Sequence, residues 1–155
     1  TGPVQLGSLW EIMSDAQQTP SAIADPNRVR GGFADLTDYH LTAWRQDEAE
    51  VSLLVRHQHL NRSGVMHGGM LTTLIDTACG YSGCYRDEPE QSLRAFTLSL
   101  TCQFISTAEA GAKLTARAVR KGGGRSIFYA SCEVTDALGR LIGQGEGVFK
   151  YITRP

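Results

Sequence analysis

Between residues 61 and 83 the chain changes from a polar loop into an apolar segment rich in small residues. This change predicts a loop followed by a buried helix that ends near Gly83. The pair Gly68-Gly69 stands at the boundary, where glycine allows a sharp turn and the close approach of another group. The first amides of a helix lack intrahelical partners, so together with the helix dipole they favour negative charge. The sequence therefore predicts an anion-binding helix start at this pair.

The same helix carries a carboxylate, Asp76, within an apolar run. A buried charge is costly unless it is paired or used. Asp76 follows Gly69 by seven residues, about two helical turns, so both project from nearly the same face. An apolar stripe for packing forms a separate face, made of Leu71, Leu74, Ile75, Ala78 and Ser82. Acyl transfer to water needs a site that binds an oxyanion and a carboxylate that acts on water or on the carbonyl carbon. The helix start and Asp76, two turns later, could provide these two groups. The alternative interpretation is that Gly68-Gly69 only forms a turn and that Asp76 is only solvated.

The complete string from Asn61 reads Asn-x-x-Gly-x-x-His-Gly-Gly, then an apolar helix with Leu-Ile-Asp-Thr-Ala. It resembles the hotdog-fold acyl-CoA thioesterases, in particular the phenylacetate-pathway and human thioesterase-superfamily type. The similarity spans about residues 32 to 149. In that family a curved sheet wraps one long helix, and the active sites lie between two subunits.

The rest of the chain alternates in the manner of strands, and Phe33 opens this strand-like character. The order is a hairpin, the long helix and then a run of about four strands, which predicts an α+β fold with an antiparallel sheet. One helix and about six strands are the hotdog arrangement. Three glycines on one face of the last strand, Gly143, Gly145 and Gly147, predict close approach of the helix. The strands are expected at residues 39–45, 49–56, 94–105, 113–120, 126–135 and 141–151.

A length of 155 residues favours a single domain. We expect residues 1–31 to form an N-terminal helical arm, with a short amphipathic helix over 8–17, and residues 32–155 to form the hotdog domain.

The resemblance implies a catalytic role for five residues. Asp76 would be the general base for water or the nucleophile, and the Gly68 amide would bind the thioester oxygen. Asn61 would help to hold the reacting groups, and His67 would shape the loop and contact the carbonyl region. Thr97 would place a hydroxyl near the water. Asp76 and Thr97 would come from the chain opposite to the other three. Asn61 is also explained as a loop cap, His67 as a structural residue and Thr97 as an ordinary strand residue.

A basic, glycine-rich segment between two expected strands is the candidate site for the phosphates of coenzyme A. Relatives use this region for the nucleotide, although three glycines make the segment looser than theirs, and a solvated hairpin turn is the alternative. The expected substrate-binding residues are Gly69, Arg120, Lys121, Gly122, Arg125 and Ser126.

Composition limits the partners. The net charge of −1 gives no support for nucleic-acid binding. The sequence lacks an apolar run of 18 residues and a visible signal peptide, so we expect a cytoplasmic protein without a membrane partner. The spacing of the four cysteines predicts buried free thiols rather than a metal site. No cofactor is expected, because coenzyme A is part of the substrate. Pairing of the edge strand 94–105 with its copy implies an obligate dimer, and relatives suggest further assembly into a tetramer.

The predicted function is therefore an acyl-CoA thioesterase, with a non-catalytic acyl-CoA sensor of the same fold as the alternative. A hotdog hydratase is less suitable because His67 is wrongly placed for one. The sequence leaves aryl-acetyl, benzoyl-like and medium-chain acyl groups open.

Overall fold

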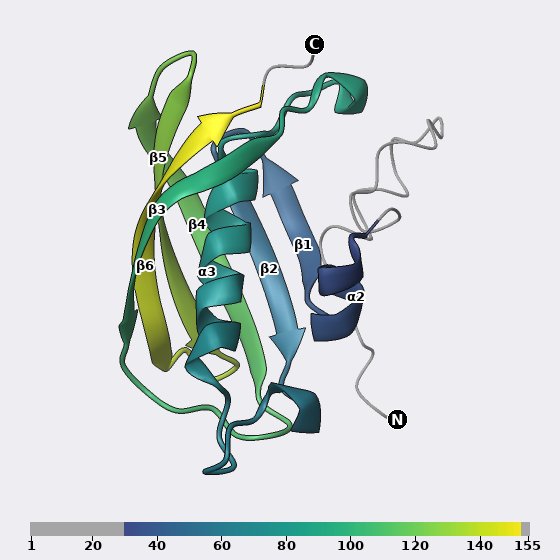
Figure 1. Cartoon of the computed structure of the whole chain (residues 1–155), viewed down its shortest axis with the longest axis vertical. Coiled ribbons are helices and arrows are strands. Elements are labelled where there is room, and N and C mark those ends of the chain that lie inside the picture. Colours follow the sequence, from purple (N-terminus) through teal and green to yellow (C-terminus); the bar gives the residue numbers. More distant parts are fainter. Residues whose placement is uncertain (1–29, 153–155) are drawn as a thin grey trace, which may run out of the picture.

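The computed structural model describes residues 30–152, in which a long helix lies along a curved antiparallel sheet (Figure 1). The long helix is α3 (Gly68–Ser82), and a short helix, α2 (Gly32–Thr37), precedes the sheet. The strands are β1 (His40–Arg45), β2 (Glu48–Leu54), β3 (Ala95–Phe104), β4 (Lys113–Gly123), β5 (Ile127–Asp136) and β6 (Leu141–Tyr151). Single 3-10 turns occur at His57–His59 and Pro89–Gln91.

The six strands are ordered β1-β2-β4-β5-β6-β3, and every neighbouring pair is antiparallel. The predicted α+β architecture is confirmed, as are the first hairpin and the four strands after the helix. β3 lies at one edge of the sheet and β1 at the other. The expectation that β3 is an edge strand is therefore correct.

The core forms where α3 meets the concave face of the sheet. The predicted apolar stripe of the helix is buried throughout, and Met70 and Cys79 join it. Glycines of β6 allow the helix to come close: a Cβ on Gly143 would lie 2.5 Å from Leu71, and one on Gly145 would lie 2.9 Å from Ile75. The glycine face of β6 therefore allows α3 to pack closely against it, as the sequence predicts.

Three details differ from expectation. Phe33 lies in helix α2 rather than in a strand, because the segment forms a helical turn that ends at Asp38 with φ 58°. Arg120, Lys121 and Gly122 belong to β4, which pairs with β5 as far as Gly123, so the expected loop is shorter. The expected alternation of β3 fails because a bulge lies between Thr97 and Ser99. The predicted helix over residues 8–17 lies outside the described residues.

None of the helices that the structure describes is long and apolar enough to cross a membrane. The four cysteines are free, and three of them are buried; Cys102 is half-buried. Within residues 30–152 no group of three or more His, Cys, Asp or Glu side chains is arranged to hold a metal ion.

Candidate active site

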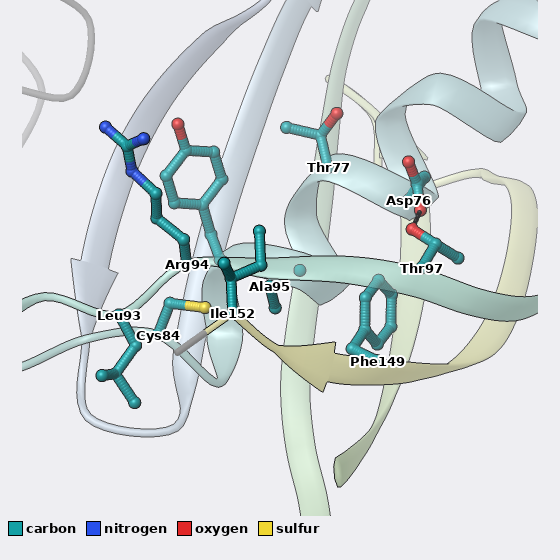
Figure 2. Close-up of a pocket in the computed structure, with 11 residues that line it drawn as sticks. Asp76, Thr77, Cys84, Leu93, Arg94, Ala95, Thr97, Phe149 and Ile152 are labelled. Carbon is teal, nitrogen blue, oxygen red and sulfur yellow. Dashed lines mark hydrogen bonds between the residues drawn. The ribbon is translucent and has the colours of Figure 1, made fainter. Parts of the chain in front are cut away.

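The carboxylate of Asp76 and the hydroxyl of Thr97 meet between α3 and β3. Thr97 Oγ1 donates a short hydrogen bond of 2.5 Å to Asp76 Oδ1 (Figure 2). Regular alternation would place Thr97 and Leu100 on opposite faces of β3. The bulge removes this conflict, because Thr97 reaches the helix while Leu100 still packs against the core. The local irregularity of β3 therefore aims Thr97 at Asp76.

A cavity of about 330 Å³ opens beside this pair and runs towards the end of α3. Asp76 and Thr97 lie at one side of it and Arg94 lies at the other, with Ala95 and Ile152 between them (Figure 2). Among the described residues that line this cavity, Asp76 is the sole carboxylate. The cavity thus combines an acidic end, an apolar middle and a basic end.

Thiol chemistry does not compete with this carboxylate. Burial raises the pKa of Cys84, which lines the cavity, to about 12. A hydrogen bond with Cys132 and burial raise the pKa of Cys79 behind the cavity, and the nearby charge of Asp76 acts in the same direction. Both cysteines are neutral thiols at neutral pH, and a neutral thiol is a weak nucleophile.

The start of α3 is built by His67. This residue is the N-cap, with extended backbone angles of φ −63° and ψ 139°, and its Nδ1 accepts a 2.7 Å hydrogen bond from the Gly69 amide. The Gly69 amide is therefore used by the cap. No residue between 30 and 152 accepts a hydrogen bond from the Gly68 amide, which stays available to a ligand.

Asn61 organises the loop before the helix. Its Oδ1 accepts hydrogen bonds from the amides of Ser63, at 2.9 Å, and Val65, at 3.4 Å. The loop cap that was the alternative for Asn61 is therefore present. The side-chain amide Nδ2 donates to none of the described residues, so Asn61 keeps two N–H donors for a bound group.

The five predicted catalytic residues form two groups within the chain. Asn61, His67 and Gly68 lie at the start of α3, whereas Asp76 and Thr97 lie two turns further on. Eight residues of helix separate Gly68 from Asp76, which is about 12 Å at 1.5 Å per residue. A single chain therefore does not bring the oxyanion donor and the carboxylate to one carbonyl group.

The basic segment expected to bind coenzyme A is divided between strand and turn. The Arg120 side chain lies 4.0 Å from Asp47, and Lys121 lines a hollow on the outer face of the sheet. Arg125 and Ser126 remain in the turn, where the Ser126 carbonyl accepts from the Tyr151 amide at 2.9 Å. The Arg94 carbonyl accepts from the next amide, Ile152, at 2.8 Å. The turn therefore adjoins Arg94, a cavity residue that the sequence analysis missed because no motif marks it.

The comparisons with known proteins identify the family and the fold. Residues 63–142 match the thioesterase superfamily. A protein of Pseudomonas aeruginosa whose name gives it as a candidate esterase is 31% identical over 104 residues, which are 67% of this chain and 75% of that protein. Acyl-coenzyme A thioesterase 13 of Mus musculus is 27% identical over 92 residues, which are 59% of this chain and 64% of that protein.

A solved structure carries the same fold. The E. coli PaaI protein from the phenylacetic acid degradation operon superposes with a TM-score of 0.71 at 25% sequence identity. The superposition covers 80% of this chain and 86% of that one. By its matched residues and its architecture, the chain belongs to the thioesterase superfamily and has the hotdog fold.

Proposed function

We propose that this protein is an acyl-CoA thioesterase that hydrolyses a thioester to a free acid and coenzyme A. The observation that carries the proposal is the hydrogen-bonded pair of Asp76 and Thr97, which faces a cavity next to the sheet edge. Membership of the thioesterase superfamily and the likeness to a mouse acyl-coenzyme A thioesterase support the reaction class.

In the proposed reaction Asp76 acts as general base and removes a proton from water while the water oxygen attacks the thioester carbonyl carbon. The carbonyl oxygen becomes an oxyanion that the Gly68 amide stabilises. When the intermediate collapses, the carbon–sulfur bond breaks and the thiolate takes the proton to leave as coenzyme A. In the other form of the proposal, the Asp76 carboxylate attacks the carbon itself, the carbon–sulfur bond breaks and the coenzyme A thiolate leaves. Water then hydrolyses the mixed anhydride, which releases the acid and restores the carboxylate.

Both forms need two chains, because Gly68 and Asp76 are about 12 Å apart along one helix. The edge strand β3 offers the means, since an edge strand presents unpaired backbone groups. Three large apolar side chains of β3 and that of the next residue are exposed: Phe96, Leu98, Phe104 and Ile105. We propose that two β3 strands pair antiparallel across a twofold axis.

This pairing brings the two halves of the site together. Thr97 contacts Asp76, and the Phe104 ring packs beside Gly68, where an added Cβ would lie 3.1 Å away. If the axis passes near Leu100 and Thr101, Thr97 lies opposite the Phe104 of the second chain. The carboxylate of one chain then lies near the helix start of the other.

Coenzyme A would bind at the basic end of the Asp76 cavity. Neither the Arg94 nor the Arg125 side chain is paired with another described residue, and guanidinium groups suit phosphates. Ser126 and the glycine-rich turn complete this end. We propose this position in place of the whole segment from Arg120, because Arg120, Lys121 and Gly122 belong to strand β4, where Arg120 and Gly122 pair with β5.

The test measures thiol release from a panel of acyl-CoA thioesters by the wild type and by Asp76→Asn. We expect turnover by the wild type and a loss of about 10²- to 10⁴-fold in kcat for the variant, the usual contribution of a general base. Full activity in a folded Asp76→Asn variant would refute the assignment. Binding of acyl-CoA by the wild type without any cleavage would favour the sensor.

The oxyanion donor has a matched pair of variants. Gly68→Pro removes the amide N–H, and proline is tolerated at the first helical position after the extended His67. Gly68→Ala adds a side chain next to Phe104 but keeps the N–H. We expect a loss of about 10²- to 10³-fold for the proline variant and a much smaller one for alanine. Equal losses would show that packing matters and the amide does not.

A further inference from the structure

A second cavity, of about 410 Å³, lies between α2 and the first turns of α3. Phe33 and Leu36 of α2 and Met70 of α3 form its apolar wall, and His67 and Gly69 lie at its rim. The hydroxyl of Thr73, also on the rim, is occupied by a 2.9 Å hydrogen bond to the Gly69 carbonyl. The cavity is therefore lined by His67 and Gly69, the residues on either side of Gly68, and offers mainly apolar surface.

The exposed apolar residues of α2 are fixed in place. Phe33 is 58% exposed and Leu36 71%, although both are large and apolar. His59, itself only 4% exposed, accepts the Arg56 amide at Nδ1, so its Nε2 carries the proton and donates to the Thr37 carbonyl at 2.6 Å. A buried histidine thus anchors the end of α2 to the loop before α3.

Arg30 holds the other side of the same helix. Its Nη2 donates 2.6 Å hydrogen bonds to the carbonyls of Ala34 and Tyr39. Since the middle and the C-terminal end of α2 are held by these bonds, its apolar face is a firm wall, and a firm wall can distinguish ligands by size.

A thioester has two arms, and the charges of the two cavities distinguish them. The Asp76 cavity ends at Arg94, next to the turn that holds Arg125, so it suits the anionic coenzyme A arm. Among the described residues the cavity under α2 has no charged side chain other than histidine in its lining. If the Gly68 amide binds the carbonyl oxygen, the acyl arm extends towards the apolar cavity under α2.

We propose that the acyl chain of the substrate lies in the cavity under α2, and that Phe33 and Leu36 determine the chain length that is accepted. The inference rests on the proposed thioesterase function. At about 30 Å³ for each water-sized group, the cavity volume of about 410 Å³ corresponds to about 14 such groups. Medium-chain and aryl-substituted acyl groups are within this size, and longer chains exceed it.

The test compares kcat/KM for acetyl-, butyryl-, hexanoyl-, octanoyl-, dodecanoyl- and phenylacetyl-CoA. Phe33→Ala removes part of the wall, and Leu36→Trp fills part of the cavity. Leu138→Ala is the matched control, because Leu138 is an apolar side chain that is 94% exposed on a distant turn. We expect Phe33→Ala to lower the octanoyl-CoA value about five- to tenfold, as loss of partial apolar burial predicts, and to leave acetyl-CoA within about twofold. Leu36→Trp should shift the optimum to shorter chains.

Equal changes for all chain lengths, or a profile identical to that of Leu138→Ala, would overturn the inference while leaving the thioesterase function intact. If the wild type cleaves no thioester, the proposed function fails, and calorimetric binding of hexanoyl-CoA and octanoyl-CoA to wild type and Phe33→Ala decides the inference. A preference for octanoyl-CoA that Phe33→Ala removes supports it, and a chain-independent affinity refutes it.

Discussion

At the scale of single residues, the chemistry depends on how Thr97 meets Asp76. Among the described residues, this hydroxyl is the hydrogen-bond partner of the carboxylate, and it comes from a strand 21 residues away in sequence. A hydrogen bond to a charged group contributes more than one between neutral groups. Thr97 thereby fixes one carboxylate oxygen and leaves the other free to approach water or the thioester carbon.

Thr97→Val tests this arrangement with a side chain of nearly the same shape. We expect kcat/KM to fall about 10- to 100-fold, the loss expected when a hydrogen bond to a charged group is removed. Thr97→Ser keeps the hydroxyl and should stay within a few-fold of the wild type. Thr97 is exposed, so thermal unfolding should change little. Equal activity of the valine and serine variants would mean that the hydroxyl is not needed.

The sequence motif predicts these residues unevenly. Asp76 and Gly68 follow from the contrast between an apolar helix and its polar start. The role of His67 as N-cap depends on backbone angles and the direction of Nδ1, which no spacing encodes. Arg94 belongs to no motif, and its place in the cavity arises from pairing of its backbone with Ile152. Tertiary contacts decide such roles.

At the scale of elements, β6 and α3 fit because glycine replaces larger side chains in the strand. A Cβ on Gly145 would lie 2.9 Å from Ile75 of α3, and 2.5 Å from the Thr101 carbonyl oxygen of β3, a backbone atom that cannot move away easily. The site depends on this contact, since it sets the depth at which α3 carries Asp76 beside β3.

Gly145→Ala should lower the free energy of unfolding by about 1–3 kcal/mol, the usual cost of overpacking a core. Gly122→Ala is the control, because a Cβ there meets nothing within 4 Å and the residue also lies in a strand. Its effect should stay within about 0.5 kcal/mol. Chemical denaturation followed by tryptophan fluorescence measures the free energy of unfolding of both variants. Similar losses for the two would disprove the close packing at Gly145.

The turn between β5 and β6 contributes stability that depends on pH. The Arg140 amide, followed by its guanidinium and by the Leu138 amide, holds the pKa of Asp136 below its ordinary value of 3.8. A lowered pKa in the folded state means that this stability is present above pH 3.8 and is lost as the pH falls through the folded value.

Asp136→Asn should therefore lower the unfolding midpoint at pH 7. The difference from the wild type should shrink as the pH falls from 3.8 towards the lower pKa of the folded state, below which the carboxyl of the wild type is neutral too. Thermal scans from pH 7 to pH 3 measure it, with Asp87→Asn in an exposed loop as the control for net charge. A difference that is constant over this range would contradict a role for the charge.

Periodicity predicts the regular elements well and the irregular ones poorly. The last strand agrees with its expected limits because alternation persists to Tyr151. The bulge in β3 is invisible to alternation, since one extra residue leaves both flanking segments looking regular. α2 is too short for a helical period to be distinguished from a strand, so Phe33 is misassigned by its pattern.

At the scale of the whole molecule, the proposed mechanism requires two chains. Asp76 lines one cavity and the neighbours of Gly68 line another, and the helix keeps the carboxylate and the oxyanion donor about 12 Å apart. A twofold axis at β3 generates two equivalent sites, each with Asp76 and Thr97 from one chain and Asn61, His67 and Gly68 from the other. The hypothesis predicts that two inactive variants with different substitutions complement each other in a mixed dimer.

Asp76→Asn lacks the carboxylate, and Gly68→Pro lacks the donor amide, so each variant alone should be nearly inactive. In a mixed dimer one site receives both defects and the other receives none. Random mixing yields half mixed dimers, and one of their two sites is intact, so co-refolded chains should regain about a quarter of wild-type activity. Two chains that are both Asp76→Asn, with different tags, are the control and should regain nothing. If the mixture stays inactive although tag capture shows mixed dimers, each site lies within one chain, and the proposed pairing through β3 is wrong.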